Sequence, residues 1–288
     1  MANSESSIAK RIQRYSTINN RKSTIHLISP KKHLGQNFLQ DDNIIRKIVA
    51  SLELHPDDIV IEIGPGPGAL TGVLADACRL TAIEVDHRAV EQLRAQFGDR
   101  VDVREADILD VNARTLAVER GGSFRVVGNI PYYITSDILF WVLDQRDVVR
   151  DATLMMQEEV ADRLVARPRT KAYGILSVFA QHYTVPRRMF GVSRSCFYPR
   201  PEVDSAVVRL DIRRSVPDVD DTLFRTIVRG TFGKRRKTIR NGLGYSGVAK
   251  EIIADLGPVA DQRPEELTPE EFVVLTKEVQ RRKTTLGL

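Results

Sequence analysis

The residues best placed to do chemistry include a glycine-rich turn between a predicted strand and a predicted helix. Gly64-Pro65-Gly66-Pro67-Gly68 follows an apolar run over residues 58–63, which predicts a buried strand. Glycines at such a turn let the backbone bend sharply and approach a ligand closely. The two prolines remove amide donors that would hold a pyrophosphate, so the turn favours a ligand without phosphates. The alternative is a tight strand-to-helix turn without a function.

Two acids follow the next two predicted strands. Glu84 ends the strand predicted for residues 80–85, where a carboxylate can accept hydrogen bonds from both hydroxyls of a ribose. Asp107, with Ile108 beside it, ends the strand predicted for 101–104 and is placed to accept from an adenine amino group. Either acid alone could be a helix cap or a solvated loop residue. Because the carboxyl ends of parallel strands meet at one edge, the acids and the glycine turn together indicate an adenosine-bearing ligand.

A third motif, Asn129-Ile130-Pro131-Tyr132, follows the strand predicted for residues 124–127. It resembles the signature of methyltransferases that act on exocyclic amino nitrogens. An adenine amino group is a poor nucleophile, because its lone pair is delocalised into the ring. We expect the Asn129 side-chain oxygen and the Ile130 carbonyl to accept from the two amino protons, which localises that lone pair. Pro131 would fix the turn and Tyr132 would stack on the extruded base. The alternative is a proline turn with a packed tyrosine.

Over residues 31–245 the chain resembles the KsgA family of small-subunit ribosomal RNA adenine dimethyltransferases. It shares with that family the motifs above, the segment Gly35-Gln36-Asn37-Phe38-Leu39, a segment beginning at Phe197 and the basic segment 232–241. The resemblance implies S-adenosylmethionine as the cofactor. It places Asn37 and Leu39 at the cofactor's methionine end, with Gly64, Gly66, Glu84, Asp107, Ile108 and Asn129 also in contact with the cofactor. It further implies that Phe197 and Tyr132 sandwich the target adenine.

The resemblance also implies a target, namely two neighbouring adenosines in the 3′-terminal hairpin loop of small-subunit (16S) rRNA. Both would be dimethylated within an immature 30S particle. The nearest rival is a relative that dimethylates a large-subunit rRNA adenine and confers macrolide resistance. The segment 234–241 favours the small-subunit enzyme. A non-catalytic assembly or transcription factor on the same fold is a rival from another class, and the intact Asn129, Pro131, Tyr132 and Glu84 argue against it.

Apolar runs alternate with helical periods from about residue 37 to residue 213, which predicts an α/β fold with a parallel sheet covered by helices on both faces. The runs 185–192 and 206–212 are expected to close the sheet as an antiparallel pair. The resemblance specifies this fold as the Rossmann-like sheet of class I S-adenosylmethionine-dependent methyltransferases. After residue 213 only helical periods remain, so a small all-helical domain is expected at the C-terminus.

This pattern predicts three parts of the chain. Residues 1–30 are rich in Ser, Asn and Arg without a structural period, which indicates a basic flexible tail. An organelle transit peptide is the alternative for this tail. Residues 31–214 form the expected methyltransferase domain. Residues 215–288 form the expected helical domain, which would bind RNA or the ribosome.

The charged residues point to a polyanionic partner. The chain has 43 Lys and Arg against 38 Asp and Glu, a net charge of +5. Two blocks, 10–32 and 225–240, contain basic residues and no acid, which indicates RNA contact, although solvated surface is the alternative. The RNA-binding candidates in the second block are Arg225, Lys234, Arg235, Arg236, Lys237 and Arg240.

The cysteines and the hydropathy exclude several classes of protein. Cys78 and Cys196 are the only cysteines, so neither a disulfide framework nor a zinc-binding Cys/His pattern is present, and no metal is expected. No apolar run is long enough to cross a membrane, and no secretory pattern is found. We therefore expect a cytoplasmic protein, and with the target that the resemblance implies we expect it to work as a monomer on small-subunit rRNA.

Overall fold

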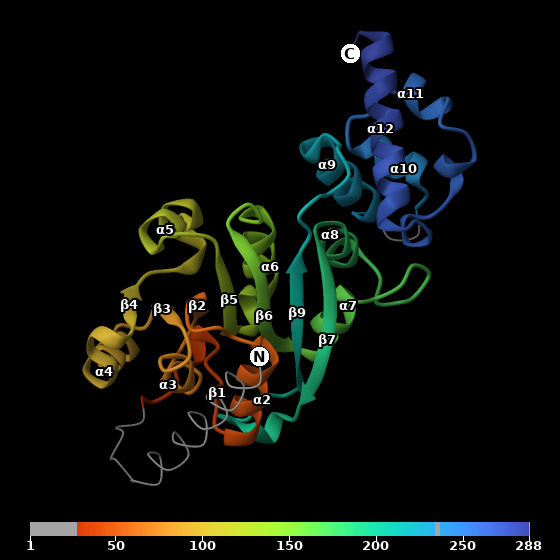
Figure 1. The fold of residues 1–288 in the computed structure, drawn as a ribbon. Coiled ribbons are helices and arrows are strands. Elements are labelled where there is room, and N and C mark those ends of the chain that lie inside the picture. The colour runs from red at the N-terminus through yellow and green to blue at the C-terminus, as the bar shows by residue number, and fades with distance from the viewer. Residues whose placement is uncertain (1–27, 234–236, 288) are drawn as a thin grey trace. The chain divides into compact units, whose positions relative to one another are not determined.

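The structure, a computed structural model, describes residues 28–233 and 237–287 (Figure 1). The predicted tail 1–30 therefore lies almost wholly outside the described residues. The chain divides into two compact units. The first contains the described residues up to Ala161 and the stretch Arg187–Ile212. The second contains Asp162–Pro186 and the chain from Arg213 onward.

The first unit is built on a seven-stranded sheet with the strand order β4-β3-β2-β5-β6-β9-β7. The strands are β2 (Ile59–Ile63), β3 (Arg79–Glu84), β4 (Asp102–Glu105), β5 (Phe124–Asn129), β6 (Val149–Gln157), β7 (Thr184–Val192) and β9 (Ser205–Ile212). Strands β4, β3, β2, β5 and β6 pair in parallel, whereas β9 runs antiparallel to β6. The predicted parallel sheet is confirmed. The two runs expected to close it form its last two strands, β9 and β7.

Helices follow the parallel strands, as the alternating pattern predicts. They are α3 (Thr71–Leu74), α4 (His87–Phe97), α5 (Ala113–Arg120), α6 (Thr135–Asp144) and α7 (Glu158–Leu164), while α2 (Asp42–Leu52) precedes β2. The central strand β2 is buried along its whole length, as a strand covered on both faces must be. Asp86 caps the start of α4 by accepting a hydrogen bond from the Arg88 amide. These crossovers bring the ends of β2, β3, β4 and β5 to one edge of the sheet.

A second sheet in the first unit consists of two short strands far apart in sequence. Strand β1 (Phe38–Leu39) pairs antiparallel with β8 (Phe197–Tyr198). Phe38 lies opposite Tyr198, and Leu39 lies opposite Phe197. Successive residues of a strand point to opposite faces, so the two pairs belong to opposite faces of this ribbon. A strand of two residues has no period that the sequence could reveal.

The second unit is helical. Its helices are α8 (Ile175–Tyr183), α9 (Asp221–Phe232), α10 (Ile239–Tyr245), α11 (Lys250–Ala254) and α12 (Pro269–Leu286). Helix α12 begins at a capping box between Thr268 and Glu271. Helix α8 belongs here because its Phe179 ring packs edge-on against Phe224 of α9, with ring centroids 6.0 Å apart. The compact unit therefore includes residues 162–186, which lie before the predicted boundary at residue 214.

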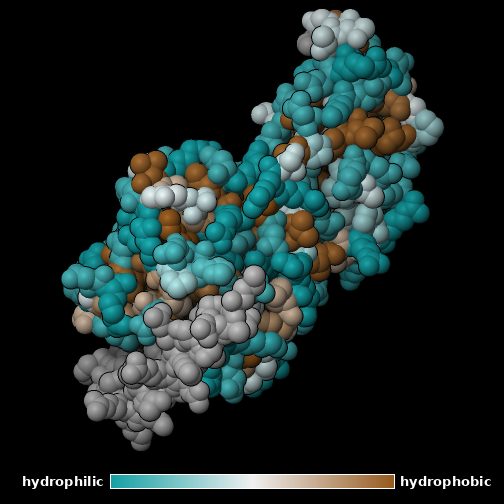
Figure 2. All heavy atoms as spheres, viewed as in Figure 1, coloured by the Kyte–Doolittle hydropathy of each residue, from teal (hydrophilic) through white to brown (hydrophobic). Residues whose placement is uncertain are grey.

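The surface drawn in Figure 2 is mostly hydrophilic, with apolar side chains showing in patches between polar ones. Within the described part of the chain, no helix is both long and apolar enough to cross a membrane.

Candidate active site

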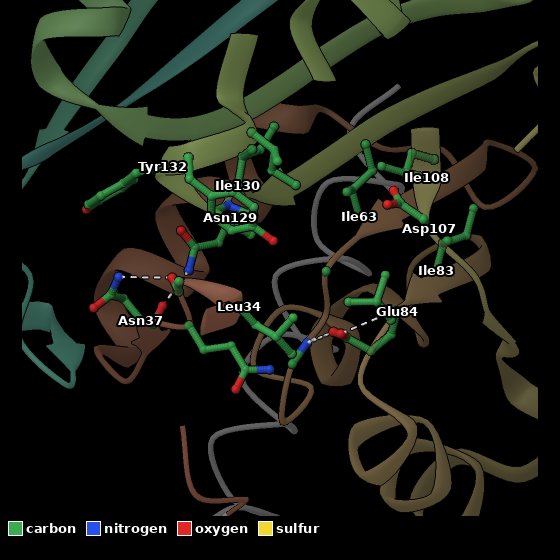
Figure 3. A pocket seen from close by; sticks show the side chains of 18 of the residues that line it. Leu34, Asn37, Ile63, Ile83, Glu84, Asp107, Ile108, Asn129, Ile130 and Tyr132 are labelled. Atoms are coloured by element: carbon green, nitrogen blue, oxygen red, sulfur yellow. Dashed lines mark hydrogen bonds between the residues drawn. The ribbon is translucent and has the colours of Figure 1, made fainter. Parts of the chain in front are cut away.

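A cavity of about 280 Å³ opens in the first unit at the carboxyl ends of β2, β3 and β5 (Figure 3). It brings together most of the residues singled out from the sequence: Asn37, Gly64, Gly66, Glu84, Asp107, Ile108, Asn129, Ile130, Pro131 and Tyr132. Of the predicted catalytic and cofactor-binding residues, Leu39 and Phe197 are not on its wall. Glu84, Asp107 and Ile108 lie at one end of the cavity, and Asn37, Asn129 and Tyr132 lie at the other.

All three glycines of the turn, Gly64, Gly66 and Gly68, have positive φ angles. Gly64 and Gly66 have φ angles of +61° and +54°, which side chains disfavour. A Cβ atom on Gly66 would also lie 3.0 Å from the ring of Phe38. The turn thus leaves a cradle in the cavity wall that a larger residue would distort.

Glu84 is buried and held by backbone amides. Its Oε2 accepts from the Gly66 amide at 3.0 Å, and its Oε1 accepts from the amides of Val85 and Asp86 at 3.0 and 2.9 Å. Burial raises the pKa of the Glu84 carboxyl, and the three amides oppose this rise. A carboxylate offers about four lone-pair positions, so three are already used. Accepting both hydroxyls of a ribose would require one amide to release its oxygen.

Asp107 stands at the same end of the cavity, just after β4. Its Oδ1 accepts from the Leu109 amide at 2.9 Å and caps the 3₁₀ turn η3 (Ile108–Asp110). The cap and the ligand role are therefore compatible, because the cap uses one oxygen and Oδ2 remains the acceptor for an amino group. Ile108 is buried and contributes an apolar wall.

Asn129 ends β5 at the other end of the cavity. Its Nδ2 donates to the main-chain carbonyl of Asn37 at 2.8 Å. A carbonyl can only accept, so this contact identifies which side-chain atom is the nitrogen, and leaves Oδ1 as the acceptor that can face a ligand. The next amide, of Ile130, donates to the Met155 carbonyl on β6 at 3.0 Å and ties the turn to the sheet.

Tyr132 begins the 3₁₀ turn η4 (Tyr132–Ile134) and is partly buried on the cavity wall. Its hydroxyl shares a hydrogen bond with the Ser205 hydroxyl on β9, at 2.8 Å. Burial raises the pKa of Tyr132, so the phenol stays neutral at physiological pH. The contact fixes the ring orientation, and an aromatic ring held in this way can serve as a stacking surface for a base.

Leu39 and Phe197 do not lie on the wall of this cavity. Both side chains are 5% exposed and belong to the hydrophobic core, where they face each other across the β1–β8 pair. On the opposite face of the same ribbon, Phe38 lines the cavity and Tyr198 is 57% exposed. In this structure Phe197 therefore packs the core and does not form a sandwich with Tyr132. Leu39 reaches only a smaller neighbouring cavity of about 30 Å³.

The RNA-binding candidates divide into three groups. Lys234, Arg235 and Arg236 lie outside the described residues. Lys237 is exposed, and Arg240 is 42% exposed and paired with Asp261. Arg225 differs from these, because its side chain is only 17% exposed and its Nε donates to Asp221 and to the Tyr183 hydroxyl. These contacts tie α9 to α8, so Arg225 serves the packing of the second unit.

Several residues that line the cavity were not among the predicted site residues. Gln36 and Phe38 line it from the segment 31–39, within a motif whose other members were singled out. The two-residue strand β1 gives the sequence no period that could have chosen Phe38 over Leu39. Tyr133, 60% exposed, lines the cavity next to the catalytic motif.

Comparison with known proteins decides the family. Residues 28–279 match the sequence profile of the family described as ribosomal RNA adenine dimethylase. The chain belongs to this family. Its similar relatives include "Ribosomal RNA small subunit methyltransferase A" of Chlorobium phaeobacteroides strain BS1, at 47% identity over 88% of this chain and 94% of the relative. The protein of the same name from Salinibacter ruber is 48% identical over 86% of this chain and 84% of the relative.

Solved structures agree with this assignment. A dimethyladenosine transferase from Plasmodium falciparum superposes with a TM-score of 0.73, over 87% of this chain and 98% of its own. Its sequence identity is 22%, so this similarity supports the fold alone. The 23S rRNA methyltransferase ErmE superposes with a TM-score of 0.63 at 29% identity, covering 85% of this chain and all of its own. The chain thus has the class I methyltransferase fold and is an S-adenosylmethionine-dependent rRNA adenine dimethyltransferase.

The cavity fits S-adenosylmethionine, which supplies an electrophilic methyl group on a sulfonium when bound. The prolines of the glycine turn suit a ligand without phosphates, the carboxylates of Glu84 and Asp107 can accept from its ribose and adenine, and the cradle at Gly66 leaves room for it. The carboxylates of Glu84 and Asp107 on the cavity wall also suit a positively charged ligand such as this sulfonium. The residues that would hold S-adenosylmethionine are Asn37, Gly64, Gly66, Glu84, Asp107 and Ile108.

Proposed function

We propose that this enzyme dimethylates two adjacent adenosines in the 3′-terminal hairpin loop of small-subunit rRNA, within a pre-ribosomal 30S particle. The observation that carries the proposal is the orientation of Asn129, whose amide nitrogen is bound to the Asn37 carbonyl. An asparagine held in this way presents an acceptor to the cavity, as adenine amino chemistry requires. The relatives of 47–48% identity that are named for the small subunit support the choice of rRNA.

The large-subunit enzyme is the rival for the substrate. ErmE, named for 23S rRNA, shares the fold over its whole length but only 29% of residues. The small-subunit relatives are more similar over a comparable share of this chain. The basic segment 234–241 adds to this preference, because it resembles the small-subunit enzymes outside the catalytic unit.

In the proposed mechanism, the residues of the base end prepare the nucleophile. Asn129 Oδ1 and the Ile130 carbonyl accept the two hydrogens of the adenine amino group, which concentrates its lone pair on nitrogen and points it along the cavity toward the cofactor end. Tyr132, fixed by Ser205, stacks on the flipped base. The methylated amine is strongly acidic and loses its proton to water, so no side chain has to act as a base.

The RNA contacts outside the cavity are also part of the proposal. Lys234–Lys237 and Arg240 would contact the phosphate backbone, with residues 215–288 as the RNA-binding domain and 31–214 as the methyltransferase domain. We place the enzyme in the cytoplasm, because the similar relatives are bacterial. We propose that it works as a monomer, because its binding partner is the RNA.

Mass spectrometry of rRNA tests this function. Cells lacking the protein should contain unmodified adenosines in the terminal 16S loop. Wild-type protein should restore both dimethyladenosines, and Asn129→Ala should not. Restoration on 23S rRNA in place of 16S would favour the large-subunit rival, and rRNA modified equally in the deleted strain would refute the assignment.

A further inference from the structure

The segment before β1 is fastened to the first unit through one buried carboxylate. Asp86, in the turn between β3 and α4, has a side chain that is fully buried. Its Oδ1 contacts Lys31 Nζ at 3.0 Å, and its Oδ2 accepts from Gln36 Nε2 at 3.1 Å. Gln36 in turn accepts from the Lys31 amide through Oε1, at 2.8 Å. The three side chains thus close residues 31–36 into a loop held against the turn.

We propose that Asp86 is a positioning residue for methyl transfer, which holds the segment 31–37 so that the Asn37 carbonyl fixes the Asn129 amide. The inference rests on the proposed role of Asn129. It assigns a function to a residue that does not line the cavity.

The segment contacts the catalytic turn at two places. Besides the Asn37 carbonyl, which accepts from Asn129 Nδ2, Gly35 lies against the turn: a Cβ atom there would be 3.0 Å from the Tyr133 ring and 3.7 Å from Pro131. Asn37 Nδ2 also donates back to the Gly35 carbonyl at 3.2 Å, which keeps the bend compact. A shift of this segment would therefore move the partner that sets the orientation of the Asn129 amide.

Asp86 also connects to the cofactor end. Its amide donates to Glu84 Oε1 at 2.9 Å, so the same turn carries the ribose acid and the anchor of the segment. Arg88 strengthens the anchor, because it pairs with Asp86 at 2.7 Å and donates to the Ser29 carbonyl at 3.2 Å. The Arg88 guanidinium, with Lys31 and Gln36, holds the pKa of Asp86 well below its usual range, so the anchor remains charged.

Asp86→Asn tests the anchor, since asparagine keeps the N-cap of α4 and removes the charge that holds Lys31. Fold integrity is expected, because Lys31 and Arg88 are 36% and 41% exposed and can be hydrated. Hydrogen exchange of the ligand-free protein should show faster exchange in residues 31–37. At saturating S-adenosylmethionine, kcat should fall about tenfold, within the ~10²-fold that a misplacement of ~1 Å can cost.

The matched control is Asp147→Asn, which removes an exposed ion pair with Arg114 elsewhere in the first unit. It should change neither exchange in residues 31–37 nor kcat. A second pair of variants tests the partner: Lys31→Met should reproduce the effect of Asp86→Asn, Lys31→Arg should largely restore kcat, and Lys32→Met, at the exposed neighbour, should do nothing. Unchanged exchange and unchanged kcat in Asp86→Asn would overturn the inference.

A double-mutant cycle separates positioning from a general loss of structure. If Asp86 acts through Asn129, adding Asp86→Asn to Asn129→Ala should lower kcat by less than twofold. A tenfold further loss, as independent effects would give, would overturn the proposed link. If Asn129→Ala alone leaves turnover unchanged, the proposed function loses its mechanism. If Asn129→Ala abolishes turnover and Asp86→Asn does not lower it, only the present inference fails.

Discussion

At the cofactor end of the cavity, the key carboxylate is held by partners that are close in sequence, whereas at the base end the partners are distant. The oxygens of Glu84 accept from amides one, two and eighteen residues away. Asn129 and Tyr132 are held by partners 92 and 73 residues away. The cofactor end is thus largely a property of the consecutive elements β2, α3 and β3, and the base end exists only after distant segments have met. Substitutions should therefore act locally at the first end and through tertiary contacts at the second.

The largest effect is expected for Phe197→Ala, and on stability. Because Phe197 is buried in the core against Leu39, truncation should lower the free energy of unfolding by about 3–5 kcal/mol. Urea denaturation of the ligand-free protein measures this. A variant as stable as wild type that binds target RNA more weakly would show instead that Phe197 leaves the core to stack on the base.

Asn129→Ala should lower the single-turnover methylation rate by about 10²–10³-fold, the scale for one pre-placed polar group. The stability should change little, because the lost hydrogen bond is partly solvent-exposed. Rapid-quench measurement on the terminal-loop RNA checks this value. Normal turnover would remove Asn129 from the mechanism.

Glu84→Ala should weaken S-adenosylmethionine binding by about 1.5–3 kcal/mol, the scale for hydrogen bonds to a charged group. Calorimetric titration gives the affinity. Glu84→Gln is the matched control, since it keeps the shape and one acceptor oxygen and should lose less. Equal affinities of the three proteins would mean that the cofactor end does not depend on this acid.

Tyr132→Ala should remove ~1–3 kcal/mol of base stacking, seen as weaker binding of target RNA. Tyr132→Phe keeps the ring and loses only the Ser205 contact, so it should bind RNA nearly as well and react somewhat more slowly. If both variants bind RNA like wild type, the ring is not the stacking surface.

The smallest effect over a single pH unit is a change in stability with pH near the cofactor end. Burial raises the pKa of Glu62 to about 8, with a hydrogen bond from Thr71 opposing the rise and Glu84 adding to it. The folded protein therefore holds a proton that the unfolded chain has released, so stability should fall as pH rises from about 4.5 to about 8, by at most ~1.4 kcal/mol per pH unit. Glu62→Gln should flatten this slope in urea titrations at pH 6 and pH 7. An unchanged slope would assign it to other groups.

The sequence by itself determined the strand-turn-helix units and the chemistry at their ends. The run 59–63, the glycine turn, Glu84 and Asp107 are each recognisable from a few neighbouring residues, because apolar period, backbone freedom and strand ends are local properties. The catalytic turn at Asn129 was also recognised, and the structure places it in the same cavity.

Only the tertiary structure decided which side chains face that cavity from the chain's distant segments. A two-residue strand has no period, so sequence could not tell that Phe38 faces the cavity while Leu39 and Phe197 face the core. The clustering of basic residues in the sequence likewise could not show that Arg225 forms hydrogen bonds that join α8 and α9. The same holds for Asp86, whose partners Lys31 and Gln36 lie 55 and 50 residues away. Such contacts depend on how packed elements meet, which no local pattern records.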